Sequence, residues 1–425
     1  MSTPRVIEPV TSLKGVMRVP GSKSIANRAL VCAALAEGES VIRNLSDSSD
    51  TSMMINGLNQ MGVLATSSGD ATTVRGTGGR LFAPKYPIPV GNAGTTLRFL
   101  ISVAARAAGS TVFEGSERMA QRPIAPLLEA LAALGVLVEF QPQASRYVVH
   151  GGNMKGGRTS VSGDKSSQFV SSLLLASPGV QNGLVLETPG TLASVPYLSM
   201  TVRVMRSFGV EVQARNGGFE IPPGIRYRPA EYVVEADASS ATYPFAAAAI
   251  CGGSVTVEGL AQDSMQGDAV LLEVLERMGC AVHRVGTRST VSRTKPLHGV
   301  DVDMNSMPDA VPALVGAALF AETPTRIRNV AHLRFKESDR LGTLAGELKR
   351  LGADVRVLDD GLEVHPAPLH GEQLNPHDDH RLAMVFALIG LRVPGVAVEQ
   401  PECVQKSYPK FWDELDGLSI HTTDS

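Results

Sequence analysis

The chain is poor in cysteine and in aromatic residues, and its charges are not gathered into runs of one sign. Its 425 residues include four cysteines, one tryptophan and seven tyrosines. The thiols belong to Cys32, Cys251, Cys280 and Cys403, and none forms a C-x-x-C pair. The spacing therefore predicts neither a zinc site nor a disulfide framework. We expect the protein to work without a metal or an organic cofactor.

Targeting and membrane signals are also missing. The N-terminus lacks a basic stretch followed by an apolar one, and no apolar run reaches the roughly 18 residues of a membrane span. These absences predict a cytoplasmic protein that does not bind membranes. The 42 acidic and 39 basic residues give a net charge of −3, whereas a nucleic-acid-binding protein is usually basic or carries a basic stripe. No nucleic-acid partner is expected.

A polar turn followed by an Ala/Leu-rich stretch recurs along the chain, whose length already favours two domains. The turns are anchored at Ser22, Asn92, Asp164, Asp237, Asp309 and Asp379. Subtracting successive residue numbers gives intervals of 70, 72, 73, 72 and 70 residues. These intervals are well above the roughly 20–50 residues of a solenoid repeat, so each one has room for both helices and strands.

A second, amphipathic helix repeats in phase with the first and is stopped by glycine. The glycines are Gly62, Gly135, Gly209, Gly279, Gly352 and Gly417, and each is predicted to be a left-handed cap. Short β-branched runs, such as residues 254–258 and 325–330, lie between the helices and predict strands.

The repeat predicts a mixed α/β fold of two domains, each made of three units. The first helix of a unit is apolar almost all round, as over residues 246–250 and 382–391, so it should be buried. The second helix is one-sided and should face outward. Each domain is then an inside-out α/β barrel, with buried helices and flanking sheets. We expect residues 1–19 with 236–425 to form one domain and residues 20–235 to form the other, inserted domain.

Basic and amide side chains accompany several of the turns. Lys23, Arg98 and Gln168 follow the first three turns, and His380 and Arg381 follow the sixth. Each residue alone has a structural explanation, because polar turns are ordinary helix caps and single charges form ordinary ion pairs. A buried helix whose N-terminus also carries a cation favours an anion site, since free N–H groups and the helix dipole attract negative charge.

Further cations lie at other expected helix starts. Arg122 precedes Pro123, which we expect to open a helix, and Lys406 precedes the last amphipathic helix. Lys336 and Arg340 lie in one short segment. Several such residues are what phosphate and carboxylate ligands need, because charge-assisted hydrogen bonds are the strong ones. Together these positions predict convergence on one anion-binding site.

Two acids complete the candidate site. Near so many cations, the carboxylates of Asp309 and Glu337 should remain ionised and available as proton acceptors. The spacing is explained equally well if Asp309 caps a helix and Glu337 is an ion-pair partner. With acids and cations together, the sequence favours an enzyme acting on small anionic molecules.

Taken in order, these motifs resemble one enzyme family over nearly the whole chain. They are Pro-Gly-Ser-Lys-Ser at 20–24 with Asn-Arg-Ala-Leu at 27–30, Gly-Asn-Ala-Gly-Thr at 91–95 with Arg98, Arg-Pro-Ile at 122–124, Ser-Ser-Gln at 166–168, Lys-Glu-Ser-Asp-Arg at 336–340, Asp-His-Arg at 379–381 with Ala-Met at 383–384, and Lys406. The chain resembles the 5-enolpyruvylshikimate-3-phosphate synthases. The resemblance implies transfer of the enolpyruvyl group of phosphoenolpyruvate to the 5-hydroxyl of shikimate 3-phosphate through a tetrahedral intermediate, in the shikimate pathway to chorismate and aromatic amino acids.

The resemblance also implies a role for each matching residue. The catalytic residues would be Asp309, Glu337, Lys23 and His380. Asp309 would accept the hydroxyl proton and Glu337 would protonate the methylene carbon, although the sequence leaves open whether Lys23 makes one of these transfers. Shikimate 3-phosphate would be bound by Lys23, Ser24, Arg28, Ser166, Ser167, Gln168, Ser194, Tyr197, Asp309, His332 and Lys336. Phosphoenolpyruvate would be bound by Lys23, Gly94, Arg122, Gln168, Arg340, Arg381 and Lys406.

Two positions depart from the family pattern. Phe99 follows Arg98 where proline is common, and His332 stands where some members have an asparagine that contacts the substrate phosphate. Gly94 is unsubstituted, which leaves room for the family inhibitor glyphosate and favours inhibition. Phe99 leaves the degree of glyphosate sensitivity open. The family is generally monomeric, so we expect a monomer.

Three alternatives remain open from the sequence. The sister family transfers enolpyruvyl to a UDP-amino sugar, but its members usually have asparagine where Ser24 stands and a reactive cysteine in the loop at 114–121, which here has none. A non-catalytic anion-binding protein built on the same repeats would not need Asp309 and Glu337. A nucleic-acid-binding module would need more aromatic stacking groups than the single tryptophan and seven tyrosines provide.

Overall fold

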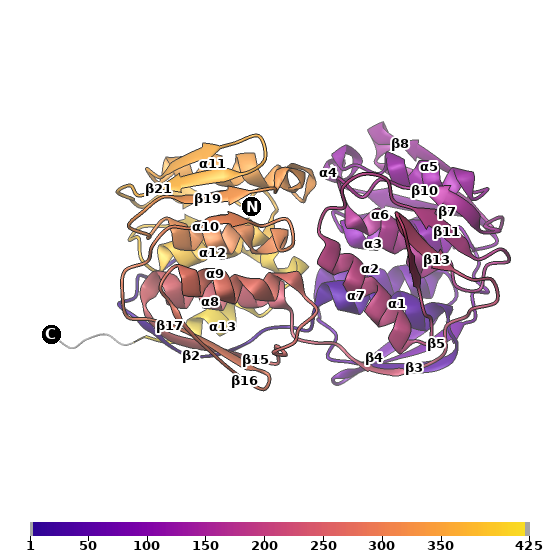
Figure 1. Ribbon diagram of the computed structural model, residues 1–425, viewed down its shortest axis with the longest axis horizontal. Helices are drawn as coiled ribbons and strands as arrows, with labels where there is room; N and C mark the ends of the chain where they lie inside the picture. The colour runs from indigo at the N-terminus through magenta and orange to yellow at the C-terminus, as the bar shows by residue number, and fades with distance from the viewer. Residues whose placement is uncertain (1–2, 421–425) are drawn as a thin grey trace. The chain divides into compact units, whose positions relative to one another are not determined.

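The computed structural model describes residues 3–420 and separates into two compact units (Figure 1). The N-terminal unit is Gly21–Val234. The C-terminal unit combines the residues up to Pro20 with those from Glu235 onward. Each limit lies one residue from the boundary expected from the repeats.

The N-terminal unit contains three four-stranded sheets of identical topology. Their orders are β14-β3-β5-β4, β6-β7-β9-β8 and β10-β11-β13-β12. In each, the first two strands are parallel and the others follow antiparallel. The strands are β3 (Glu37–Arg43), β4 (Leu64–Ser68), β5 (Ala71–Thr77), β6 (Ile88–Gly91), β7 (Gly109–Gly115), β8 (Leu137–Gln141), β9 (Arg146–Gly151), β10 (Gly157–Ser160), β11 (Leu184–Glu187), β12 (Gln213–Arg215), β13 (Gly218–Ile221) and β14 (Glu231–Val233).

Within the described residues, the C-terminal unit has the same arrangement twice in full and once shortened. The full sheets are β16-β17-β15-β2-β24 and β18-β19-β21-β20, and the short one is β1-β23-β22. In the first, β2 and β15 form the parallel pair, although more than 200 residues separate them. The strands are β1 (Arg5–Val6), β2 (Leu13–Arg18), β15 (Gly253–Glu258), β16 (Ala281–Val285), β17 (Arg288–Arg293), β18 (Asp301–Asp303), β19 (Thr325–Arg328), β20 (Asp354–Val357), β21 (Leu362–His365), β22 (Gln373–Leu374), β23 (Ala397–Val398) and β24 (Ser419–Ile420).

Three inner helices form the centre of each unit. They are α1 (Lys23–Leu35), α3 (Gly94–Ala104) and α6 (Ser167–Ala176) in the N-terminal unit, and α8 (Ala238–Cys251), α10 (Val311–Ala318) and α12 (His380–Gly390) in the C-terminal unit. The three helices of a unit contact one another, and every residue of α8, α10 and α12 is buried. In Figure 1, α8, α10 and α12 of the C-terminal unit lie between the sheet with β19 and β21 and the sheet with β15 and β17. The prediction of buried helices flanked by sheets is confirmed.

Close helix packing explains one glycine of the inner layer. A Cβ atom on Gly316 of α10 would come within 2.6 Å of the Val385 side chain on α12. Real Cβ contacts are longer, so only glycine lets these two helices approach as they do.

The second helix of each repeat is half-exposed, as the one-sided pattern predicts. These helices are α2 (Ser49–Gln60), α5 (Ala125–Ala133), α7 (Val195–Ser207), α9 (Leu271–Arg277), α11 (Arg340–Arg350) and α13 (Phe411–Asp416). Glycines at positive φ follow the first five: Gly62 (96°), Gly135 (86°), Gly209 (80°), Gly279 (104°) and Gly352 (90°). Gly417 has φ −73°, so the prediction of a left-handed cap there was wrong. The chain continues from Gly417 into β24, and this turn needs no positive φ.

Only three of the six anchors are the N-cap residues of their helices, and of these Asp237 and Asp379 cap with the side chain, whereas Ser22 makes no side-chain capping hydrogen bond. Ser22, Asp237 and Asp379 stand at the N-caps of α1, α8 and α12, whereas α3, α6 and α10 are capped at Ala93, Ser166 and Ala310. The other three anchors use their side chains elsewhere. Asn92 accepts a hydrogen bond from Arg122, Asp164 accepts one from Ser162 Oγ, and Asp309 pairs with cations.

Pro123 does not open a helix, contrary to expectation. Arg122 is the C-cap residue of the short helix α4 (Glu117–Gln121), and α5 begins at Ala125 with a proline in its first turn at Pro126. The carbonyl of Pro123 accepts a hydrogen bond from Arg98 at 2.9 Å. Pro123 therefore belongs to a linker that binds a site arginine.

Short 3-10 helices carry several site residues. They are η1 (Pro142–Ala144), η2 (Gly267–Val270), η3 (Pro308–Ala310), η4 (Ala331–Phe335) and η5 (Pro401–Lys406). Over residues 3–420, no helix has the length and apolar character to cross a membrane. In the same span, no three His, Cys, Asp or Glu side chains are grouped as metal ligands would be. The four cysteines are buried free thiols.

Candidate active site

Hydrogen bonds and an ion pair join the starts of the three inner helices of the N-terminal unit. Lys23 of α1 pairs with Asp50 of α2, and the hydroxyl of Thr96 in α3 donates to the backbone oxygen of Asp50 at 3.1 Å. Gln168 of α6 donates from Nε2 to Thr95 Oγ1 at 3.0 Å. The first turns of α1, α3 and α6 therefore lie at one end of the unit. Helix N-termini gathered in this way attract anions, because each presents free N–H groups and partial positive charge.

Lys23 is held by an acid that the sequence did not single out. Its Nζ lies 3.1 Å from Oδ2 of Asp50, and the two side chains are 11% and 3% exposed. Asp50 lies in the first turn of α2, whose N-cap residue Ser48 accepts a hydrogen bond from Thr51 N. The sequence signal was limited to a Ser/Asp-rich helix start, which is ordinary capping chemistry.

Arg28 is almost wholly buried, with 1% of its surface exposed. Its guanidinium donates to Thr201 Oγ1 at 2.7 Å, to the backbone oxygen of Ser24 at 2.7 Å and to the backbone oxygen of Tyr197 at 3.3 Å. It also lies 5.2 Å from the centre of the Phe99 ring. These contacts tie α1 to α7.

Gly94 and Arg122 lie against each other. Arg122 Nη1 donates to the backbone oxygen of Asn92 at 3.0 Å and to its Oδ1 at 3.2 Å. A Cβ atom on Gly94 would lie 2.6 Å from Cζ of Arg122. The glycine is therefore required for the guanidinium to lie across the start of α3, where its charge adds to that of the helix N-terminus.

Gln168 is fixed by two neighbours from α3. Its Oε1 accepts a hydrogen bond from Arg98 Nη1 at 2.7 Å, and its Nε2 donates to Thr95. Ser166 caps α6 by accepting from the backbone N–H of Gln168 at 3.3 Å, and Ser167 is 5% exposed. The three residues thus form a rigid helix start.

Ser194 and Tyr197 open α7. Ser194 is a buried N-cap residue at φ 56°, a left-handed conformation that is uncommon for a residue with a side chain. Backbone outliers of this kind gather at ligand sites. Tyr197 is half-buried, and its backbone oxygen ties the helix to Arg28.

In the C-terminal unit, the carboxylate of Asp309 forms ion pairs with three cationic side chains. It lies in η3, just before α10, and its carboxylate is 3.0 Å from Arg381 Nη2, 3.1 Å from Arg340 Nη1 and 3.6 Å from Lys336 Nζ. The interpretation of Asp309 as a helix cap is wrong, because α10 is capped at Ala310.

Arg340 binds the carboxylates of this cluster together. Asp339 caps α11 by accepting from Gly342 N at 3.1 Å, which places Arg340 at the first helical position. Its guanidinium, 1% exposed, lies 2.6 Å from Glu337 Oε2 and 2.9 Å from Asp379 Oδ2, besides the contact with Asp309. Asp379 also caps α12 through Arg381 N at 3.1 Å. In the sequence, Asp379 is a repeat anchor and the first residue of the Asp-His-Arg motif, but its pairing with Arg340 depends on tertiary packing.

The surroundings fix the charges of this cluster. Burial raises the pKa of the Asp309 carboxyl, but the charges of its three cationic partners outweigh burial and hold the pKa well below its usual range. Burial lowers the pKa of Arg340, but its three carboxylate partners outweigh this and raise it above the ordinary value. Asp309 is therefore ionised near neutral pH and cannot donate a proton in this state.

The two histidines lie beside the same cluster. His380, 1% exposed, begins α12 with Nδ1 3.8 Å from Asp379 Oδ1. His332 lies in η4, and burial together with the charge of Lys336 lowers its pKa to about 4. His332 is therefore neutral at pH 7 and acts as a hydrogen-bonding group. Lys406 is half-buried at the end of η5, which packs against α12.

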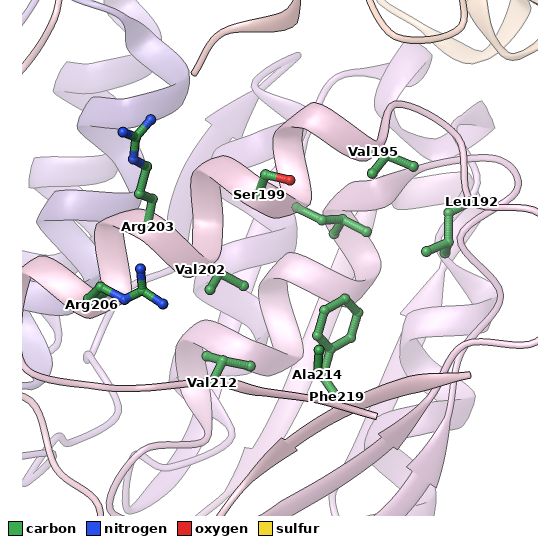
Figure 2. A pocket seen from close by; sticks show the side chains of 10 residues that line it. Leu192, Val195, Ser199, Val202, Arg203, Arg206, Val212, Ala214 and Phe219 are labelled. Atoms are coloured by element: carbon green, nitrogen blue, oxygen red, sulfur yellow. The ribbon is translucent and has the colours of Figure 1, made fainter. Parts of the chain in front are cut away.

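A separate cavity of about 390 Å³ lies on the other face of α7 (Figure 2). Val195, Val202 and Phe219 line it, and Figure 2 shows Arg203 and Arg206 extending from the same helix. None of the predicted site residues lines this cavity. Its lining carries no acid, and the chemistry of the molecule belongs to the two helix-start clusters.

Those clusters define a class of enzyme: one that binds small anions with arginine and lysine and moves protons with carboxylates. The EPSP synthase (3-phosphoshikimate 1-carboxyvinyltransferase) family matches residues 7–415. A 3-phosphoshikimate 1-carboxyvinyltransferase of Methanoculleus marisnigri is 45% identical over 404 residues, covering 94% of this chain and 96% of that protein. One of Syntrophobacter fumaroxidans is 42% identical over 423 residues, covering 97% and 99%. The chain belongs to the EPSP synthase family.

Solved structures agree with this assignment. The EPSP synthase of Acinetobacter baumannii has a TM-score of 0.81 at 25% identity, covering 98% of this chain and 99% of that one. The enolpyruvyl transferase NikO of Streptomyces tendae has a TM-score of 0.79 at 21% identity and shares the fold, covering 98% of each chain. The resemblance seen in the sequence is confirmed, and the sister family and the non-enzymatic alternatives are set aside.

Proposed function

We propose that this protein transfers the enolpyruvyl group of phosphoenolpyruvate to the 5-hydroxyl of shikimate 3-phosphate and releases phosphate. Family membership supports the reaction. The observation that carries the assignment of roles is the carboxylate of Asp309 set among Arg381, Arg340 and Lys336. No cofactor is needed, because the reaction requires only proton transfers and charge stabilisation.

In the addition step, the 5-oxygen of shikimate 3-phosphate bonds to C2 of phosphoenolpyruvate. The hydroxyl proton passes to Asp309, and a proton from Glu337 adds to the methylene carbon, giving a tetrahedral ketal. In the elimination, the new methyl carbon returns a proton to Glu337, the double bond re-forms, and the C2–O bond to phosphate breaks with its electron pair leaving on phosphate. The proton held by Asp309 leaves with the phosphate, so both carboxylates are restored. Lys23 is the alternative proton carrier in either step, and His380 supports the cluster through Asp379.

The low pKa of Asp309 has a consequence for this scheme. A carboxylate held strongly acidic is a poor base, since a good general base has a pKa near the working pH. When the anionic groups of the substrates bind the cations around Asp309, they share the positive charge that depresses its pKa. The pKa of Asp309 then rises toward a useful value only in the loaded enzyme.

The substrate contacts follow from the two clusters. For phosphoenolpyruvate we propose Lys23, Gly94, Arg122, Gln168, Arg340, Arg381 and Lys406. For shikimate 3-phosphate we propose Lys23, Ser24, Arg28, Ser166, Ser167, Gln168, Ser194, Tyr197, Asp309, His332 and Lys336. A single well-placed hydrogen-bond donor can contribute about 3–4 kcal/mol to transition-state stabilisation.

Glyphosate is proposed as an inhibitor because Gly94, one of the proposed phosphoenolpyruvate contacts, is unsubstituted. We further propose that the protein is a cytoplasmic monomer. Light scattering coupled to gel filtration tests the monomer directly, and a dimer mass at micromolar concentration would overturn it.

The central test is phosphate release from phosphoenolpyruvate, with and without shikimate 3-phosphate, by the wild type and by Glu337→Gln. We expect release that requires shikimate 3-phosphate and falls at least ~100-fold in the variant, the usual loss for a general acid–base. Release with a UDP-amino sugar in place of shikimate 3-phosphate would overturn the substrate assignment.

A further inference from the structure

Asp268 is a buried carboxyl close to the acid–base cluster that none of the proposed steps uses. It lies in η2, between α8 and α9, and is 3% exposed. The hydroxyl of Ser239, in the first turn of α8, donates a hydrogen bond to its Oδ2. The neighbouring Gln266 fastens the same loop, accepting from Ala238 N at 3.1 Å and donating to the backbone oxygen of Ala236 at 2.7 Å.

The elements around Asp268 bring it under the influence of the active-site charges. η2 packs against η3, which carries Asp309, and against α8 and α9. The charged groups that act on Asp268 are the carboxylates of Asp309 and Asp237 and the guanidinium of Arg381. The charged residues of α9 (Glu273, Glu276 and Arg277) are exposed, and α8 contributes only the uncharged hydroxyls of its serines, Thr242 and Tyr243.

This setting gives Asp268 an unusual titration. Burial raises the pKa of Asp268 to about 7, the charge of Asp309 acts in the same direction, and Arg381 and the Ser239 hydroxyl act against them. Asp268 and Asp309 therefore share the positive field of Arg381 when Asp268 is ionised. When Asp268 is protonated, the positive charge of Arg381 interacts only with Asp309 and with any bound anion.

We propose that Asp268 is a positioning residue that couples the binding of phosphoenolpyruvate at Arg381 to the uptake of one proton. The inference rests on the proposed function, in which Arg381 binds phosphoenolpyruvate. An anion at Arg381 removes the charge that favours ionised Asp268, so binding draws a proton onto Asp268. By linkage, loss of that proton at higher pH weakens the binding of phosphoenolpyruvate.

The test compares KM for phosphoenolpyruvate in the wild type and Asp268→Asn from pH 6.0 to 8.5, at saturating shikimate 3-phosphate. The ratio of the two KM values cancels the ionisation of the substrates. We expect a ratio that is constant near pH 6 and rises above pH 7, by up to about tenfold if binding moves the titration by one pH unit. Asp263→Asn, an exposed acid three residues before Gln266 in the same loop, is the matched control and should leave the ratio flat.

A second variant separates this role from a structural one. In Ser239→Ala the carboxyl remains but loses a hydrogen bond that favours its ionised form, so the rise in KM should move to higher pH. A merely structural residue would change kcat or stability without moving this midpoint. If Asp268→Asn does not fold, the midpoint of Ser239→Ala decides alone.

The outcomes distinguish the two levels of inference. Wild-type enzyme that shows no shikimate-3-phosphate-dependent phosphate release overturns the proposed function itself. Active enzyme with a KM ratio independent of pH, or with an unmoved midpoint in Ser239→Ala, overturns the role of Asp268 and leaves the reaction intact.

Discussion

The ammonium group of Lys23 lies 3.1 Å from the carboxylate of Asp50, with both side chains largely removed from water. Breaking such a buried pair by removing one partner costs about 3–5 kcal/mol, because the other charge stays buried. We therefore expect Lys23→Met to destabilise the N-terminal unit by about this amount. The double variant Lys23→Met/Asp50→Asn should regain most of the stability but none of the activity. Urea unfolding followed by circular dichroism measures the cycle.

The same unit offers a control for this cycle. Arg80 and Glu37 form an ion pair of 2.8 Å whose side chains are 73% and 70% exposed. Surface pairs contribute about 0–1 kcal/mol, so Arg80→Met should scarcely change the unfolding midpoint. Strictly additive losses in the Lys23/Asp50 cycle would show that the two residues act independently.

Replacing Asp309 should affect stability in a pH-dependent manner. Since the folded state lowers the pKa of Asp309, its ionised form contributes stability above the unfolded value of about 3.9, and that contribution is lost as the pH falls through the folded value. Asp309→Asn should therefore be less stable than wild type at pH 7, and the gap should narrow below about pH 4. The urea unfolding midpoints of the two proteins, measured from pH 7 to below pH 4, check this prediction. A stability difference that widens in acid would contradict an ionised Asp309.

Gly94→Ala should weaken binding of phosphoenolpyruvate. The added Cβ would lie 2.6 Å from Cζ of Arg122, so the guanidinium must move. We expect KM for phosphoenolpyruvate to rise about tenfold, the effect of losing roughly 1.4 kcal/mol of binding. Gly94→Ala should also weaken inhibition by glyphosate. Gly346→Ala, in open space on α11, is the control and should leave both constants unchanged, with a stability gain of about 0.5–1 kcal/mol.

His332 should make the protein sensitive to mild acid. Its folded pKa of about 4 lies below the unfolded value of about 6.5, so the unfolded state binds a proton that the folded state rejects between these values. Wild type should lose stability as the pH falls from 6.5 to 4, at a rate approaching about 1.4 kcal/mol per pH unit from this residue. His332→Asn should lack this loss. Parallel pH dependences for the two proteins would contradict a neutral buried His332.

The architecture could be predicted because it depends on local sequence patterns that repeat along the chain. Residues 382–391 are apolar on every side, and a helix of that kind has to be buried whatever surrounds it. Five of the six helix-ending glycines have positive φ for the same local reason. The failures at Asn92, Asp164 and Asp309 arose because each polar side chain had a better partner than its own helix.

The partners of the site residues could not be predicted from the sequence. Asp50, Asp379 and Asp268 each look like ordinary acids of a turn or helix start. Their importance depends on packing that brings them to Lys23, Arg340 and Arg381, far away in the chain. The sequence identified the cations and two of their carboxylate partners, Asp309 and Glu337, whereas the structure was needed to find Asp50, Asp379 and Asp268.

The pairing of β2 with β15 has a consequence for biosynthesis. β2 is synthesised well before its parallel partner, which begins only at Gly253. The N-terminal unit, by contrast, is complete once β14 has paired with β3. On the ribosome, the inserted N-terminal unit can therefore fold while β2 is still unpaired, because domains fold as units as they are synthesised. β2 thus precedes the inserted unit in the chain but pairs only after that unit has been made.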